Sequence, residues 1–213
     1  MNGILFDVNT DSTSLVASDA HKLVCYTVKS VNAPEKASFI LHKKPASILK
    51  NILAKVTDEI AVTFDSRNAI FTLGNTVLVC RLIEGTYPAY RTVIPKNNPN
   101  KMIIGRIELL NAVRRVAVCS NQATSHIVLK LDTNELMITA EDTEFSISAY
   151  EKISCQYDGA SMSIGFKAPF LAEILGNFPY ENICMELADS CRAALIVSAD
   201  EKDPAEDLCA LLM

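Results

Sequence analysis

The stretch Leu82–Pro95, LIEGTYPAYRTVIP, separates two halves of the chain that carry similar patterns of apolar residues. Its two prolines fix the φ angle and favour extended geometry in the residues before them, and Gly85 ends the apolar run that leads into it. Tyr87 and Tyr90 supply aromatic surface for burial, which a disordered linker would lack. We therefore expect an ordered, extended connector rather than a helix.

Before the connector, the sequence predicts strands on both sides of one helix. Ile48, Leu49, Ile52 and Leu53 share one helical face, and Pro45 suits the first turn of that helix. The strand-like runs of this half are Ile4–Val8, Ser14–Val28, Ala37–His42, Ile60–Phe64, Ala69–Leu73 and Thr76–Leu82. A polar turn at residues 9–13 joins the first two runs, which predicts a hairpin.

After the connector, the same order returns with an additional helix. Helical spacing of apolar residues predicts helices at Arg106–Val118 and Pro169–Phe178. The strand-like runs are Ile127–Leu131, Glu135–Ala140, Phe145–Ile153, Ser161–Phe166, Ile183–Leu187, Ala193–Ser198 and Leu208–Leu212. Helices beside antiparallel strands in both halves predict the α+β fold class.

The two halves align with each other as an internal repeat. Ile52–Leu53 corresponds to Ile174–Leu175, an offset of about 120 residues, which is far beyond the roughly 20–50 residues of solenoid repeats. The second copy has the helix Arg106–Val118 before its first hairpin, whereas the first copy begins at its hairpin and lacks roughly 20 residues. We therefore expect an incomplete domain with its connector at 1–95, a second domain at 96–213, and a chain that is a fragment.

The composition predicts packed cores and a soluble protein. Hydrophobic residues make up 49% of the chain and charged residues 21%. No apolar run approaches the roughly 18 residues that a membrane span needs, and the N-terminus lacks the pattern of a signal peptide. The formal net charge of −5 argues against a simple basic nucleic-acid binder, but an average can hide a basic face.

The seven cysteines and three histidines show no spacing typical of a metal site or a disulfide framework. No two cysteines are spaced CxxC, and His21, His42 and His126 are scattered along the chain. We expect no metal, no cofactor and no disulfide framework. Most of the cysteines lie in apolar runs, so we expect mainly buried thiols, as suits a reducing cytoplasm.

Five separated stretches stand out as motifs: MNGILFD (1–7), LVASDAHKLV (15–24), LIEGTYPAYRTVIP (82–95), IGFKAPFLAEIL (164–175) and DLCALLM (207–213). In this order, they resemble the bacterial DNA polymerase III β sliding clamp family. The family's chain has three similar domains, and this sequence resembles the later part of the second and nearly all of the third. The resemblance implies a DNA-clamp fold, with antiparallel sheets outside and helices on the inner, concave side.

The resemblance also implies a function without a reaction, that of a processivity factor in DNA replication. Two full-length chains would close head to tail into a homodimeric ring around duplex DNA. The replicative polymerase, the clamp loader and repair proteins would dock on the ring through short peptide motifs.

The basic residues lie on the polar faces of the predicted helices. From the sequence alone, a solvated helix face is the commoner explanation. The resemblance implies instead that these side chains contact phosphates without reading bases, which gives weak and strongly salt-dependent binding. The DNA-facing residues would be Lys43, Lys44, Lys50, Arg114, Arg115 and Lys167.

A peptide-binding pocket is a further implication of the resemblance. Its residues would be Ser18, Ala20, His21, Lys22, Leu23, Pro88, Thr92, Val93, Lys167, Phe170, Cys191, Ala193, Leu211 and Met213. Thr92 stands where many family members have arginine, and Phe170 where a tyrosine is common. An apolar cleft with a few polar edges suits a peptide anchor. Ordinary packing is the alternative for Val93 and Leu211.

The contact between the two chains of the ring would involve Val118, Cys119, Glu141, Asp142 and Glu144.

Two other functions remain open from the residues. Asp19, His21 and Cys25 would share one face of an extended strand and suggest a cysteine-dependent hydrolase, although no oxyanion-hole or phosphate-loop signature accompanies them. The chain would otherwise be a two-domain peptide-binding adaptor without a DNA role.

Overall fold

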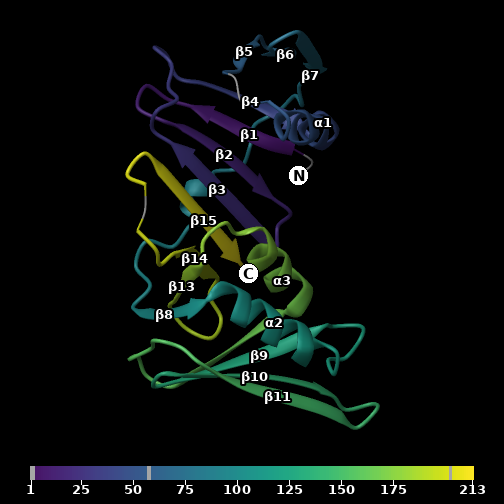
Figure 1. Ribbon diagram of the computed structural model, residues 1–213, viewed down its shortest axis with the longest axis vertical. Coiled ribbons are helices and arrows are strands. Elements are labelled where there is room, and N and C mark those ends of the chain that lie inside the picture. The colour runs from purple at the N-terminus through teal and green to yellow at the C-terminus, as the bar shows by residue number, and fades with distance from the viewer. Residues whose placement is uncertain (1–2, 57–58, 202) are drawn as a thin grey trace. The chain divides into compact units, whose positions relative to one another are not determined.

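The structure is a computed structural model that describes residues 3–56, 59–201 and 203–213 (Figure 1). The first two residues of the MNGILFD stretch lie outside the described residues. The chain divides into two compact units: unit 1 is Met1–Arg91 with Pro204–Asp207, and unit 2 is Thr92–Asp203 with Leu208–Met213. The division falls after Arg91, a few residues before the boundary that the sequence suggested.

Unit 1 contains two antiparallel sheets and a helix. One sheet has the order β4-β1-β2-β3, and the other has the order β5-β6-β7. The elements are β1 (Gly3–Val8), β2 (Thr13–Ser18), β3 (Lys22–Val28), β4 (Ala37–His42), α1 (Lys43–Leu53), β5 (Ala61–Phe64), β6 (Asn68–Leu73) and β7 (Thr76–Arg81). The expectation of one long strand at 14–28 is wrong, because a turn at Ala20, whose φ is 76°, divides this run into β2 and β3.

The helix α1 begins where the sequence predicted it. The Nδ1 atom of His42 accepts a hydrogen bond from the backbone N–H of Lys44 at 3.2 Å, and Pro45 lies in the first turn. Within α1, whose residues are all described, Leu49 alone is buried. It packs into a small core with Phe39 and its neighbours, which holds the helix against both sheets.

Unit 2 has the same kinds of elements preceded by a further strand and helix. Its sheets have the orders β11-β10-β9-β12 and β15-β14-β13-β8. The elements are β8 (Asn100–Gly105), α2 (Arg106–Ala117), β9 (His126–Asp132), β10 (Glu135–Asp142), β11 (Ile147–Ser154), β12 (Met162–Lys167), α3 (Ala168–Asn177), β13 (Asn182–Leu187), β14 (Ala194–Ser198) and β15 (Glu206–Leu212). A large core lies among α2, α3 and the two sheets. The sequence missed β8, because a short run with two buried residues is ambiguous without its neighbours.

The connector is extended over most of its length, as predicted, but it closes one tight turn. The backbone N–H of Tyr90 donates to the carbonyl of Pro88 at 2.7 Å, and Tyr90–Thr92 form a 3₁₀ turn. The expectation of wholly extended geometry is therefore wrong at this turn. Tyr90 is buried and Tyr87 is half-buried, so the aromatic surface of the connector is used for packing.

The cysteines are all free thiols, and fewer of them are buried than the sequence suggested. Cys25, Cys80 and Cys184 are buried, whereas Cys191 is exposed in a turn. The other three, Cys119, Cys155 and Cys209, are half-buried. The expectation that most are buried is wrong, because a run of apolar sequence does not say which face of a strand points inward.

Neither a metal site nor a membrane-spanning helix is found among the described residues. They contain no group of three His, Cys, Asp or Glu side chains placed to hold a metal ion. They also contain no helix long and apolar enough to cross a membrane.

Candidate functional site

The turn between β2 and β3 presents the first group of residues assigned to the peptide site. The Oδ1 atom of Asp19 accepts hydrogen bonds from the backbone N–H groups of His21 at 3.0 Å and Lys22 at 2.8 Å, and Ser18 Oγ accepts one from Ala20 at 3.2 Å. The Nζ atom of Lys22 lies 3.0 Å from Asp19 Oδ2. These bonds hold the turn in one shape, in which Ala20 and His21 are exposed.

The hydrogen bonds of this turn also act on the Asp19 carboxyl. Partial burial raises the pKa of Asp19, but the hydrogen bonds from Lys22 and His21 together outweigh this, so the pKa lies below its ordinary value. The carboxylate is therefore charged at neutral pH and remains available to hold the turn. Leu23, which follows the turn on β3, is buried.

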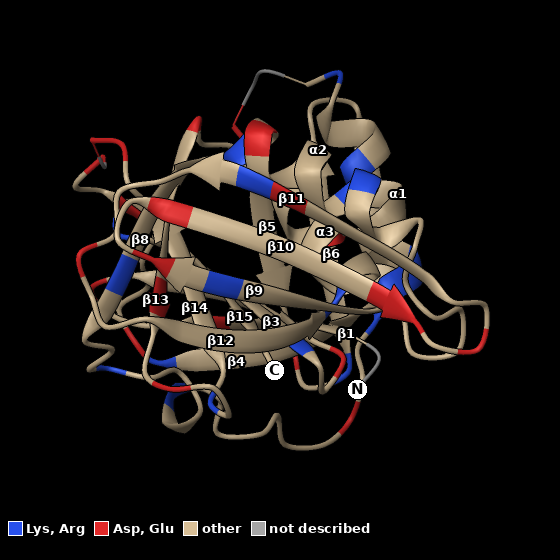
Figure 2. Cartoon of the chain, turned by 90° about the horizontal axis from the view of Figure 1, so that it is seen from below, with Lys and Arg blue, Asp and Glu red and all other residues tan. Residues whose placement is uncertain are grey.

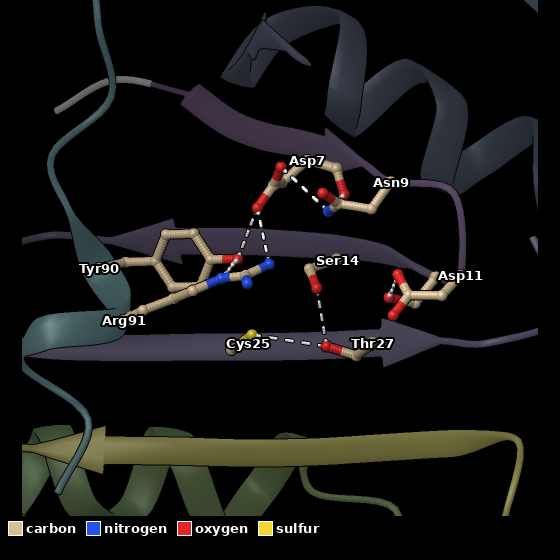
Figure 3. Close-up of polar contacts among 9 residues, drawn as sticks. Asp7, Asn9, Asp11, Ser14, Cys25, Thr27, Tyr90 and Arg91 are labelled. Atoms are coloured by element: carbon tan, nitrogen blue, oxygen red, sulfur yellow. Dashed lines mark hydrogen bonds and ion pairs between the residues drawn. The ribbon is translucent and has the colours of Figure 1, made fainter. Parts of the chain in front are cut away.

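The connector is fastened to unit 1 by a cluster of three side chains, which we call the clasp: Asp7, Tyr90 and Arg91 (Figure 3). The hydroxyl of Tyr90 donates to Asp7 Oδ2 at 2.8 Å, and Arg91 Nη2 donates to the same oxygen at 3.0 Å. Arg91 Nε also donates to the Tyr90 hydroxyl at 2.9 Å. Upstream, the Tyr87 hydroxyl donates to the carbonyl of Val16 on β2 at 3.4 Å.

Between these two anchoring tyrosines, Pro88 is exposed. The next two residues assigned to the peptide site, Thr92 and Val93, begin unit 2 and are exposed as well. An exposed proline on a fastened backbone offers apolar surface to a ligand at little ordering cost. The structure thus removes the alternative that Val93 is ordinary core.

The remaining residues assigned to the peptide site lie in unit 2. Lys167 directly precedes α3, and its Nζ atom lies 5.6 Å from the centre of the Phe170 ring, which is half-buried. Cys191 and Met213 are exposed, and Ala193 is half-buried. Leu211 is buried within β15, so packing accounts for it. The residues assigned to the peptide site therefore differ in exposure: some lie at the surface, and others are buried beneath it.

The lysines assigned to DNA contact on α1 are exposed. Lys43 and Lys44 lie in the first turn of the helix and Lys50 lies in its last turn, whereas Leu49 is buried. In Figure 2, blue segments mark basic residues on α1. A helix face with exposed ammonium groups suits loose phosphate contact, because each lysine is a flexible point charge.

The two arginines on α2 differ from each other. Arg115 forms an ion pair with Glu151 on β11, in which Arg115 Nε lies 2.9 Å from Glu151 Oε2. The hydrogen bond to Glu151 raises the pKa of Arg115, and the reciprocal bond lowers the pKa of Glu151. Arg114 is exposed on the same helix. A phosphate would have to compete with Glu151 for Arg115.

The residues assigned to the ring contact are not equally placed for it. Val118 is 83% exposed at the end of α2, and Glu141 and Glu144 are exposed. Cys119 is half-buried. Asp142 is buried, and its Oδ1 atom accepts the backbone N–H groups of Glu144 at 3.0 Å and Phe145 at 3.4 Å. Its position fits the support of a turn rather than a contact with another chain.

Sequence reasoning missed three exposed apolar residues near this group. Phe145 is 70% exposed, Tyr150 is 73% exposed, and Ile147 is exposed as well. They lie on or beside β11, which is the edge strand of its sheet. The signal was present, because β11 carries large residues on a strand that has a neighbour on one side only.

The cluster of Asp19, His21 and Cys25 is not arranged as a nucleophile with its base. The Asp19 carboxylate binds backbone N–H groups of the turn, as described above, and His21 is exposed. The thiol of Cys25 is buried in β3 and lies 3.8 Å from Thr27 Oγ1. A nucleophile must be reachable by its substrate, so this geometry favours packing over catalysis.

Comparisons with known proteins agree across both units. The family model of the DNA polymerase III beta subunit, central domain, matches residues 1–89, and that of the C-terminal domain matches residues 91–210. The beta sliding clamp of Pseudomonas aeruginosa is 29% identical over 207 residues, which cover 96% of this chain and 56% of that protein. The beta sliding clamp of Escherichia coli K12 is 30% identical over 206 residues, with the same coverage.

A solved structure gives the same result for the fold. The sliding clamp (DNA polymerase III subunit beta) of Pseudomonas aeruginosa, bound to griselimycin, is similar with a TM-score of 0.93 at 27% identity, and the match covers 100% of this chain and 56% of that one. The clamp fold expected from the sequence is confirmed. The chain spans about half the length of the curated relatives it matches. It belongs to the DNA polymerase III beta subunit family.

Proposed function

We propose that this chain supplies DNA-contact and peptide-docking surfaces of a sliding clamp, a non-catalytic processivity factor. In the full-length protein, two copies would form a homodimeric ring around duplex DNA. The replicative polymerase, the clamp loader and repair proteins would bind through short peptides. The observation that carries the proposal is that two consecutive clamp-domain models match almost the whole chain, in the order expected for the family.

The exposed lysines of α1 support the DNA part of the proposal. Contacts from a few ammonium groups release counterions from the duplex and read no bases, so binding is weak and falls steeply with salt. The net charge of −5 opposes wrapping of DNA on other surfaces. We therefore expect no stable complex of the 213-residue chain with DNA at about 150 mM salt, and a weak complex at about 20 mM salt.

The DNA part is tested by anisotropy with a fluorescent duplex of about 30 base pairs of arbitrary sequence. Lys43→Glu with Lys50→Glu changes two charges on α1, and Lys36→Glu with Lys96→Glu changes two exposed charges elsewhere. We expect the slope of log affinity against log salt to fall by about 2 for the α1 pair, at about 0.9 per phosphate contact. Equal slopes for the two pairs, or a preference for one DNA sequence, would contradict the proposal and favour an adaptor without a DNA role.

The exposed apolar residues Pro88, Val93 and Met213 support the peptide part. Apolar side chains next to a few polar groups are the usual chemistry for anchoring a short peptide. The thioether of Met213 adapts to ligands of different shape. An apolar pentapeptide of the QLxLF type is the expected ligand.

The peptide part is tested by titrating the chain into a fluorescein-labelled peptide, Gln-Leu-Ser-Leu-Phe. Val93→Asp places a charge among the proposed contacts, and Val79→Asp places the same charge on exposed β7 as a matched control. We expect the Kd to rise at least about 10-fold for Val93→Asp and to stay within about twofold for Val79→Asp. Absence of saturable binding by the unsubstituted chain would refute the peptide part.

No observation favours the hydrolase. A catalytic thiolate at Cys25 would react with iodoacetamide faster than an ordinary thiol. Because the thiol is buried in β3, we expect Cys25 to be labelled slowly in the folded chain, with exposed Cys191 labelled first. Mass spectrometry of the tryptic peptide that contains Cys25 measures the labelling rate. Rapid labelling would support the hydrolase.

A further inference from the structure

The clasp is a closed arrangement in which each of the three side chains bonds to the other two. Asp7 Oδ2 accepts from both Tyr90 and Arg91, and the Tyr90 hydroxyl donates to Asp7 while it accepts from Arg91. The second carboxylate oxygen, Asp7 Oδ1, accepts from Asn9 Nδ2 at 3.3 Å (Figure 3). The guanidinium of Arg91 also lies 5.5 Å from the centre of the Tyr90 ring. Charge-assisted bonds in such a closed group fix each member's orientation.

The clasp joins parts of unit 1 that are distant in sequence. Asp7 lies near the end of β1, whereas Tyr90 and Arg91 lie within the connector, more than 80 residues later. Burial raises the pKa of Tyr90, so its hydroxyl keeps its proton and remains a donor at neutral pH. This part of the connector is therefore held against β1 by a neutral donor and a cation on one carboxylate.

Pro88 is held on both sides by these anchors. Tyr87 is tied to β2 through its hydroxyl, and Tyr90 is tied to β1 through the clasp. The carbonyl of Pro88 also accepts the N–H of Tyr90, which closes the turn between them. Gly85, with a φ of 125°, provides the bend that lets the chain leave the sheet before these anchors. Pro88 thus has little freedom to move.

We propose that the clasp is a positioning element for peptide docking, which acts by holding Pro88 and the start of the following segment in place. This inference rests on the peptide part of the proposed function. Asp7, Tyr90 and Arg91 act through the backbone that they fasten. If the clasp is released, the peptide-contacting side chains stay the same, but the connector becomes more mobile. Binding then has to order the connector, and this loss of conformational entropy raises the Kd.

The test uses the same labelled pentapeptide and the 213-residue chain. Tyr90→Phe removes the hydroxyl with its hydrogen bonds to Asp7 and Arg91 but keeps the buried ring, and Asp7→Asn removes the charge that accepts from Tyr90 and Arg91. We expect each to raise the Kd about 5- to 10-fold. The double variant should raise it no further than the larger single effect, because the residues act as one unit. Tyr87→Phe, which removes the longer bond, should have a smaller effect.

Two controls separate positioning from a general loss of stability. Leu49→Ala weakens the core of unit 1 and leaves the three clasp residues in place, and Glu84→Gln changes an exposed connector residue outside the clasp. Both should leave the Kd within about twofold of the unsubstituted chain at 20 °C, although Leu49→Ala lowers the temperature of unfolding.

The outcomes distinguish this inference from the function on which it rests. If the unsubstituted chain does not bind the peptide, the peptide part of the proposed function fails. If it binds and Tyr90→Phe and Asp7→Asn bind equally well, the clasp inference alone is overturned. If Leu49→Ala weakens binding as much as Tyr90→Phe, the effect is one of stability, and the inference is overturned as well.

Discussion

The helices α1 and α3 occupy corresponding places in the repeat, yet they are buried to very different extents. In α3, Ala168, Leu171, Ile174 and Leu175 are buried, whereas in α1 only Leu49 is. The strands that follow differ in the same way. Every residue of β5 is exposed, whereas most residues of its counterpart β13 are buried.

The cause lies in the neighbours rather than in the residues themselves. In unit 2, α2 packs against α3, and β8 pairs with β13 on the side away from β14. Among the described residues of unit 1, nothing corresponds to α2 or β8, so α1 lacks a helix beside it and β5 pairs with β6 alone. The apolar pattern of a helix therefore predicts which face of the helix can pack. Whether that face is buried depends on the neighbouring helices and strands.

The sharpest test of this comparison uses one leucine in each unit. Leu53 and Leu175 correspond in the repeat, but Leu53 is 38% exposed and Leu175 is 0% exposed. We expect Leu175→Ala to lower the free energy of unfolding of unit 2 by about 3–5 kcal/mol, and Leu53→Ala to lower that of unit 1 by less than about 1 kcal/mol. Urea titration, with hydrogen exchange to assign the transition to a unit, measures both. Equal losses would mean that α1 is covered in solution.

Backbone protection provides the next test. The N–H groups of β13 bond on both sides of the strand, whereas β5 has one partner strand. We expect amides in Ala61–Phe64 to exchange on the order of 10- to 100-fold faster than those in Asn182–Leu187, because strand edges open locally. Mass spectrometry of peptic peptides gives the rates, and β6 serves as the internal reference. Slow exchange in β5 would show that another strand covers it.

A smaller difference in the free energy of unfolding is expected between two turns that are held by the same kind of hydrogen bond. Asp19 and Asp142 each accept two backbone N–H groups in the turn after β2 or β10, but only Asp142 is buried. Replacement by alanine removes a buried acceptor in unit 2 and an exposed one in unit 1, where water takes its place more easily. We expect Asp142→Ala to cost about 1–3 kcal/mol and Asp19→Ala less than about 1 kcal/mol, from urea unfolding. The reverse order would contradict this account of burial.

The smallest expected effect is on the stability of unit 1 at acid pH. Hydrogen bonds from the backbone of Arg67 and Asn68 hold the pKa of Asp65 below its ordinary value. A depressed pKa means that the carboxylate stabilises the fold above its unfolded pKa, near 3.8, and that this contribution is lost as the pH falls through the folded value. Asp65→Asn should therefore make the stability of unit 1 depend less on pH below about 4. An unchanged acid profile would remove Asp65 as a contributor.

The sequence predicted most helices and strands because their apolar periods are clear. The order of elements, the repeat and the start of α1 at Lys43 follow from spacing and from Pro45. The division of 14–28 into β2 and β3 could not be predicted, because it depends on Ala20 adopting a positive φ, a conformation that alanine rarely takes. The strand β8 was not predicted, because it pairs with β13, which lies far from it in the sequence.

The candidate site was less predictable than the fold. Residue types and a family resemblance named the peptide and DNA residues, but not their surroundings. The pairing of Arg115 with Glu151 and the clasp both join residues far apart in the chain, so no local pattern signals them. The burial of Asp142 is of the same kind, because a charged residue in a polar run reads as surface.

The distribution of thiols makes the chain convenient for spectroscopy. Among the seven cysteines, all of which lie in the described ranges, Cys191 alone is exposed, in a turn held by Asp189. A brief reaction with a maleimide dye would attach one fluorophore at this position without removing native residues. Since Cys191 is among the residues assigned to peptide binding, the colour and polarisation of that dye would report ligand arrival directly.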